Sequence, residues 1–142
     1  MTDFPTPKEI LPHREPFLFI DEILELTPAE YARGRWHITE QDFWVPGHFP
    51  SRPTLPGVLM CEAIGQMGAY TVLTSNRYVD KIPLFGGLDK ARFRRQVVPG
   101  DTVEIEATIT KLSARSGKGH GKVLVNDEVA CSADVMFVVV DQ

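Results

Sequence analysis

The stretch VLMCEAIGQMGAYTVL, Val58 to Leu73, decides the fold of this chain. Its residues are apolar or small almost without interruption, which is typical of a helix that is buried on all sides. A proline-rich segment from Gln41 to Pro56 leads into it, and that density of proline excludes a regular helix or strand. We therefore predict a long shaped loop followed by one helix, from about Pro56 to about Ser75, with Thr54 as its N-cap.

Strand patterns flank the predicted helix on both sides. Phe17 to Leu26 and Glu30 to Ile38 predict two strands before it. After it, Val103 to Leu112 alternates apolar and polar residues, which predicts a sheet with one face in water. Asn126–Asp127–Glu128 predicts a tight hairpin turn, with a last strand from Val129 to Val140. One long helix with a mostly antiparallel sheet is an α+β architecture, in which the sheet covers the helix.

The bulk composition is that of one globular domain, residues 1–142. A hydrophobic content of 43% with 24% charged residues excludes disordered and fibrous classes. The formal net charge of -4 argues against nucleic acid as the main partner. Cys61 and Cys131 are too few for a disulfide scaffold or a cysteine metal cluster, so we expect buried, reduced thiols. No secretory signal and no apolar run of about 20 residues is present. We expect a soluble cytoplasmic protein without nucleic-acid or membrane partners.

Two polar residues interrupt the apolar helix. Glu62 and Gln66 are four residues apart, so they lie on the same helix face, and Gln66 can orient the carboxylate. A carboxylate in a buried helix is costly unless it is paired, and the alternative is that Glu62 only satisfies a backbone or arginine group. His48 lies in the rigid loop, within Gly47–His48–Phe49–Pro50. We assign no chemistry to the other histidines, which are His13, His37 and His120.

Gly57 stands at the start of the predicted helix. Free backbone N–H groups and the helix dipole favour negative charge there, and a glycine lets a carbonyl oxygen approach closely. His48 can then take a proton alpha to a thioester carbonyl, while the Gly57 N–H stabilises the enolate-like oxygen. Glu62 can protonate the leaving hydroxyl. These residues together predict the removal of water from a 3-hydroxyacyl thioester.

Three segments carry a resemblance to a known family. GHFPSRPTLPGVLMCEAIGQ, Gly47 to Gln66, resembles the active-site signature of the (3R)-hydroxyacyl-[acyl-carrier-protein] dehydratases of fatty-acid synthesis. The shared features are a His-Phe-Pro loop, a Pro-Gly that opens a helix, the His-to-Glu spacing, and a Gln four residues after the Glu. ILPHREPFLFID, residues 10–21, and GGLDKARFRRQVVPGD, residues 86–101, match as well. The resemblance therefore covers nearly the whole chain.

The resemblance implies a hot-dog fold, in which an antiparallel sheet wraps a long central helix. It implies a hydro-lyase of fatty-acid, or related polyketide or polyene, biosynthesis, with His48 as base and Glu62 as acid. Gly57 would be the oxyanion donor and Gln66 the partner of Glu62. The His and Glu of each site would come from different subunits of a homodimer, and many relatives form trimers of dimers. No metal or organic cofactor is implied. Glu62 favours the dehydratase-only type over the dehydratase–isomerase branch, which usually has Asp there.

Positive charge gathers after the helix in an otherwise acidic chain. The residues are Lys90, Arg92, Arg94 and Arg95. They are either a solvated strand edge or a docking patch for the acidic acyl carrier protein, which delivers the acyl chain on its phosphopantetheine arm.

Two other functions remain open on the sequence. A hot-dog thioesterase would cleave the thioester bond and release free thiol. A sensing module would bind acyl thioesters without turnover, but known modules of this kind add a DNA-binding segment for which this chain has no room.

Overall fold

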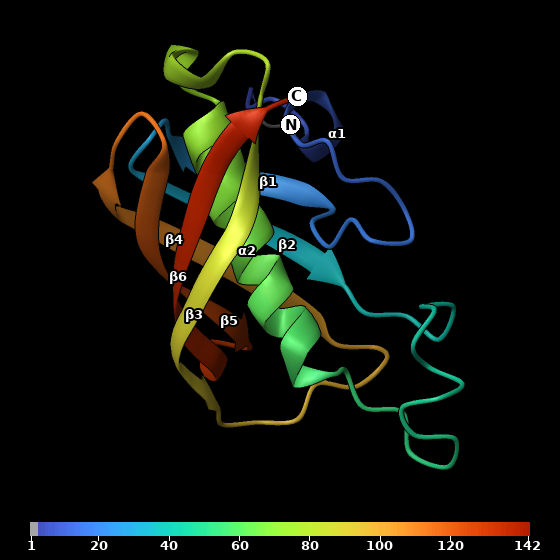
Figure 1. The fold of residues 1–142 in the computed structure, drawn as a ribbon. Helices are drawn as coiled ribbons and strands as arrows, with labels where there is room; N and C mark the ends of the chain where they lie inside the picture. Colours follow the sequence, from blue (N-terminus) through green and yellow to red (C-terminus); the bar gives the residue numbers. More distant parts are fainter. Residues whose placement is uncertain (1–2) are drawn as a thin grey trace.

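The computed structural model describes residues 3–142. In this range a six-stranded antiparallel sheet, in the order β1-β2-β4-β5-β6-β3, curves around the central helix α2, Gly57–Leu73 (Figure 1). The strands are β1 (Glu22–Thr27), β2 (Tyr31–His37), β3 (Lys81–Phe93), β4 (Thr102–Leu112), β5 (Ser116–Val125) and β6 (Glu128–Asp141). Two short helices are α1 (Pro7–Ile10) and η1 (Asn76–Tyr78). The predicted hot-dog fold, with its long helix inside the sheet, is confirmed.

Helix α2 is buried because the concave face of the sheet is apolar. The alternation in β4 places Val103, Ile105 and Ala107 on the helix side, each almost fully buried. Burying a side chain of the size of Val103 or Ile105 contributes about 1.5–3 kcal/mol. At Gly121 of β5, a Cβ atom would lie 2.4 Å from Ile64 Cγ2, so only glycine allows the helix this close to the strand. No helix within residues 3–142 is long and apolar enough to cross a membrane.

One stripe of α2 is left outside this core. Val58 is 70% exposed, and Glu62 and Gly65 are only half-buried. These positions follow the i, i+4, i+7 spacing of a single helix face. The prediction of a helix buried on all sides is therefore wrong for this stripe, because β1 and β3 are the two edges of the sheet and leave an opening between them (Figure 1).

Two local predictions before the helix are corrected. The N-cap position of α2 is Pro56, without a side-chain hydrogen bond, and Thr54 instead donates its hydroxyl to the Arg52 carbonyl at 3.1 Å. The first strand begins at Glu22 and not at Phe17. Backbone groups of residues 17 and 19 bond to the Gln66 side chain, so they make no strand ladder there.

The strands after the helix are longer than their sequence patterns suggested. The predicted turn is confirmed, since Asn126 and Asp127 have φ of 50° and 65°, the left-handed pair of a type I′ hairpin. However, β5 already begins at Ser116. The sequence did not predict this start, because glycines stand at every second position where apolar residues would mark a strand. Strand β3 is an edge strand whose residues are mostly exposed, so it has no apolar alternation to detect.

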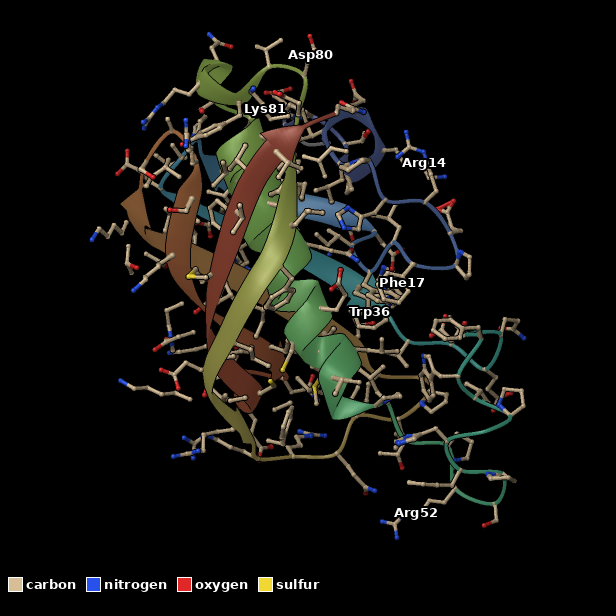
Figure 2. All side chains as sticks on the ribbon, in the orientation of Figure 1. Arg14, Phe17, Trp36, Arg52, Asp80 and Lys81 are labelled. Carbon is tan, nitrogen blue, oxygen red and sulfur yellow. The ribbon has the colours of Figure 1, made fainter. Side chains whose placement is uncertain are left out.

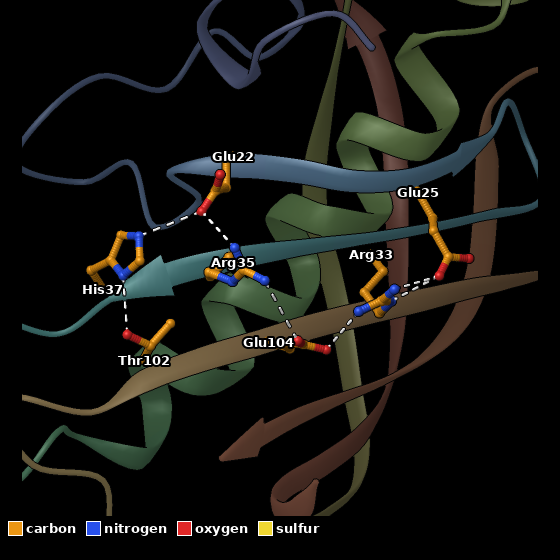
Figure 3. A network of polar contacts seen from close by, with 7 residues as sticks. All are labelled: Glu22, Glu25, Arg33, Arg35, His37, Thr102 and Glu104. Atoms are coloured by element: carbon orange, nitrogen blue, oxygen red, sulfur yellow. Dashed lines mark hydrogen bonds and ion pairs between the residues drawn. The ribbon is translucent and has the colours of Figure 1, made fainter. Parts of the chain in front are cut away.

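The outer face of the sheet carries a network of ion pairs (Figure 3). Arg33 of β2 bridges Glu25 of β1 and Glu104 of β4, the latter at 2.7 Å. Arg35 pairs with Glu22 at 3.0 Å. This is the solvated face that the alternation in β4 predicted.

Candidate active site

His48 is held rigidly in the proline-rich loop, which extends beyond the N-terminal end of α2 (Figure 1). Its backbone N–H donates to the Trp44 carbonyl at 3.0 Å, and its carbonyl accepts from the Thr54 N–H at 2.8 Å. The ring Nδ1 lies 2.7 Å from the Thr54 carbonyl oxygen. A carbonyl only accepts, so Nδ1 must carry a hydrogen, and in the neutral ring Nε2 has a free lone pair. His48 is therefore oriented to accept a proton.

Gly57 lies beside His48 in an open groove. His48, Gly57, Val58, Met60 and Phe93 are among its lining residues. The Phe93 ring packs directly on Gly57, where a Cβ atom would lie 2.8 Å from Cε1. No side chain caps the start of α2, and the Leu59 N–H donates to the Pro56 carbonyl at 3.0 Å, which leaves the N–H groups of Gly57 and Val58 for a ligand in the groove.

Glu62 faces a different hollow, a cavity of about 50 Å³. The side chain is 23% exposed, and its Oε2 accepts a hydrogen bond from Gln66 Nε2 at 3.0 Å. Gln66 itself is 1% exposed and also donates to the Phe17 carbonyl at 3.0 Å, while its Oε1 accepts from the Phe19 N–H at 2.9 Å. Gln66 thus fixes both the carboxylate and the segment that covers it.

The two hollows are separate within one chain. The residues that line the His48 groove and those that line the Glu62 cavity have no member in common. The structure therefore brings His48 together with Gly57, and Glu62 together with Gln66. It does not bring the two pairs into one cavity of a single protomer.

His13 was assigned no chemistry from the sequence, but it lies against Glu62. Its Nε2 is 3.7 Å from Glu62 Oε2, and both residues line the same cavity. Burial lowers the pKa of the His13 imidazole, and the negative charge of Glu62 offsets part of that effect. Its place in the segment ILPHREPFLFID was the only signal in the sequence that could have drawn attention to it.

The four basic residues divide into two groups. Lys90, Arg92 and Arg94 are exposed, whereas Arg95 pairs with Glu128 at 2.8 Å. Arg94 and Arg95 both line the groove that contains His48. Lys90 and Arg92 precede them on the exposed end of β3, and Arg52, labelled in Figure 2, donates to Gln96 of the same groove at 2.9 Å.

The cysteines are free and buried, as predicted. The Cys131 thiol donates a hydrogen bond to Cys61, and this bond, followed by burial, raises the pKa of the Cys131 thiol. Within the described part of the chain, no group of three or more His, Cys, Asp or Glu side chains could hold a metal ion.

Comparisons with known proteins show the family of this chain. Residues 11–134 match the model of the FabA-like domain family. The chain is 45% identical over 139 residues to the 3-hydroxyacyl-[acyl-carrier-protein] dehydratase FabZ of Desulforamulus reducens, which covers 98% of each chain. It is 41% identical over 142 residues, the full length of both chains, to the enzyme of the same name from Natranaerobius thermophilus. Among solved structures, a chain of the dehydratase heterocomplex ApeI:P from Xenorhabdus doucetiae has a TM-score of 0.84 at 13% identity, with 98% of this chain and 93% of that chain covered.

Proposed function

The chain belongs to the FabA-like domain family, and on that premise we propose that it removes water from (3R)-3-hydroxyacyl groups carried on acyl carrier protein. The product is the trans-2-enoyl thioester, as in fatty-acid biosynthesis. The likeness to FabZ dehydratases over nearly the whole length of both chains supports this enzyme class. The observation that carries the chemistry is the His48 Nδ1 contact with the Thr54 carbonyl, because it leaves Nε2 as a base.

The reaction divides between the two hollows. Nε2 of His48 takes the proton from the carbon alpha to the thioester carbonyl, and the electron pair moves onto the carbonyl oxygen. The Gly57 N–H stabilises that oxygen at the start of α2. As the electrons return, the double bond forms between the alpha and beta carbons and the beta hydroxyl leaves with the proton of Glu62 as water. Gln66 holds the Glu62 carboxyl during this step.

A single protomer does not complete this site, and a homodimer does. Strand β3 is an edge strand of 13 residues that exposes Leu84, Phe85, Leu88 and Phe93, with exposed fractions of 43–54%. A long apolar edge strand pairs readily with another strand. Two copies joined along β3 would cover this edge and bring the His48 groove of one protomer to the Glu62 cavity of its partner. Further assembly into trimers of dimers extends the same proposal.

Mixing two inactive variants tests the shared site. In a statistical mixture of His48→Ala and Glu62→Ala protomers, half of the dimers are mixed and each has one intact site. The mixture should therefore recover about one quarter of wild-type activity. If both residues acted within one protomer, every site would lack a residue and the mixture would stay inactive.

The activity itself is measured by the absorbance of the conjugated enoyl thioester. Wild type should interconvert crotonyl and 3-hydroxybutyryl thioesters, and His48→Ala and Glu62→Ala should each lose most of that rate. Release of free thiol without enoyl interconversion would establish a thioesterase instead. Binding of acyl thioesters without either reaction would establish a sensing module.

The basic residues Lys90, Arg92, Arg94 and Arg95, of which the last two line the His48 groove, provide a docking patch for the carrier protein. Arg92 is exposed and unpaired among the described residues, so Arg92→Glu removes an interaction with the carrier but no internal ion pair. This variant should raise KM for carrier-linked substrate and leave KM for a small thioester unchanged. Lys111→Glu, an exposed charge reversal on β4, is the matched control. Equal effects of Arg92→Glu on both substrates would refute the docking patch.

We place the protein in the cytoplasm. The two buried cysteines are free thiols, which is the usual state in a reducing compartment.

A further inference from the structure

A histidine outside the proposed mechanism lies against the acid residue. His13 Nε2 is 3.7 Å from Glu62 Oε2, and each side chain is 23% exposed. The other ring nitrogen, Nδ1, is buried and has no hydrogen-bond partner among residues 3–142. A buried polar atom without a partner is rare in native structures, so this imidazole needs a reason to be where it is.

The position of His13 is fixed by its own segment. The Arg14 guanidinium donates to the carbonyl of His13 at 2.6 Å, to that of Leu11 at 2.9 Å and to that of Lys8 at 3.2 Å. Leu11 is buried in the core at 2% exposure. Figure 2 shows Arg14 on the segment between α1 and Phe17. The Arg14 side chain and the buried Leu11 therefore hold the backbone of His13 in place, and the His13 side chain takes no part in these contacts.

The two neighbours of Glu62 face the same carboxyl oxygen. Gln66 Nε2 donates to Oε2 at 3.0 Å, and His13 Nε2 faces that oxygen as well. Within the described residues, Oε1 accepts no hydrogen bond. We propose that His13 is a positioning residue for Glu62, which with Gln66 holds Oε2 and leaves Oε1 to meet the leaving hydroxyl. The inference rests on the proposed dehydration.

The present separation is longer than a hydrogen bond. Catalytic contacts in unliganded enzymes are often long and shorten when substrate binds. A small rotation of the Glu62 side chain, with substrate in the cavity, closes the contact to His13.

The chemistry of the cavity suits a neutral imidazole. The walls supplied by α2, β3 and β6 include Gly65, Phe85 and Met136, and the titratable residues among the lining are Glu62 and His13 alone. On its own segment, the charge of Arg14 faces the His13 carbonyl. Burial lowers the pKa of His13, so the ring is neutral near neutral pH. A neutral donor orients the carboxyl and stabilises its anion less than a Lys or Arg would, which suits a group that has to deliver a proton when water leaves.

Two substitutions separate positioning from packing. His13→Phe keeps a ring but removes the donor, and His13→Gln places an amide N–H near the position of Nε2. His13→Phe should lower kcat about tenfold or more with KM little changed, since small misplacements of a reacting group cost up to roughly 10²-fold. His13→Gln should recover most of kcat and should lose the contribution of His13 to the acid side of the kcat–pH profile. Wild-type kcat in His13→Phe, or an equal loss in both variants, would overturn the proposal.

A measurement without turnover checks the contact itself. The imidazole Cε1–H signal of His13, assigned by its absence in His13→Gln, is titrated by NMR in wild type and in Glu62→Gln. The pKa of His13 should fall in Glu62→Gln, because the charge that offsets burial is gone. An unchanged titration would overturn this inference in an active enzyme. An inert wild-type protein would instead overturn the proposed function on which the inference rests.

Discussion

Replacing Gln66 by Met should be among the most damaging single changes in α2. The substitution keeps the volume but removes every hydrogen bond of a side chain that is 1% exposed. It leaves the Phe19 N–H and the Phe17 carbonyl without their present partners. An unsatisfied buried group of this kind costs about 1–3 kcal/mol, so the free energy of unfolding should fall by about 2–4 kcal/mol. For a chain of this size, Tm should fall by roughly 5–15 °C.

The assay is urea unfolding followed by circular dichroism, at one protein concentration because oligomer stability depends on concentration. Thr71→Val is the matched control, since Thr71 is fully buried on the same helix and donates only to the Met67 carbonyl of its own helix, at 2.7 Å. That control should lose about 1 kcal/mol or less. If Gln66→Met lost no more than Thr71→Val, the bonds from Gln66 to the Phe17–Phe19 segment would not support the fold, and the reasoning would be refuted.

Three further outcomes follow from the fold. Arg33→Met should lower the free energy of unfolding by about 0.5–1 kcal/mol, and by less in 1 M salt, because its ion pairs lie on the solvated sheet face; a salt-independent loss in urea titrations would contradict this. Gly121→Ala should cost about 1–3 kcal/mol in the same titration, since its methyl would lie 2.4 Å from Ile64 Cγ2. Cys61 and Cys131 should react with a disulfide reagent only after unfolding, because both thiols are buried; rapid labelling of the native protein would show that they are accessible.

The parts of the fold with a strong local pattern could be predicted. The proline density from Gln41 to Pro56, the apolar run in α2 and the turn at Asn126–Asp127 each depend on a few neighbouring residues. Strands without an alternation of apolar and polar residues could not be predicted from the sequence. Strand β5 has glycines where apolar residues would alternate, and the apolar residues of β3 are mostly exposed and do not alternate with polar ones. The predicted start of β1 was wrong because the Gln66 side chain forms hydrogen bonds with backbone groups at residues 17 and 19. The apolar pattern had predicted that these groups would bond to a neighbouring strand.

The sequence by itself determined the chemistry that the chain can offer. It contains a histidine in a rigid loop, a glycine that opens a helix, and a carboxylate with an amide four residues later, all within Gly47 to Gln66. Spacing along one helix is enough to pair Glu62 with Gln66, because positions four apart share a face.

Only the tertiary structure decided which groups meet across the chain. The path of the N-terminal segment over α2 places His13 beside Glu62, and no periodicity relates these two positions. The curvature of the sheet leaves the Val58–Glu62–Gly65 stripe open and puts His48 and Glu62 in separate hollows. The physical reason is that contacts between distant segments depend on how the whole sheet wraps the helix, and that shape results from packing over every strand at once.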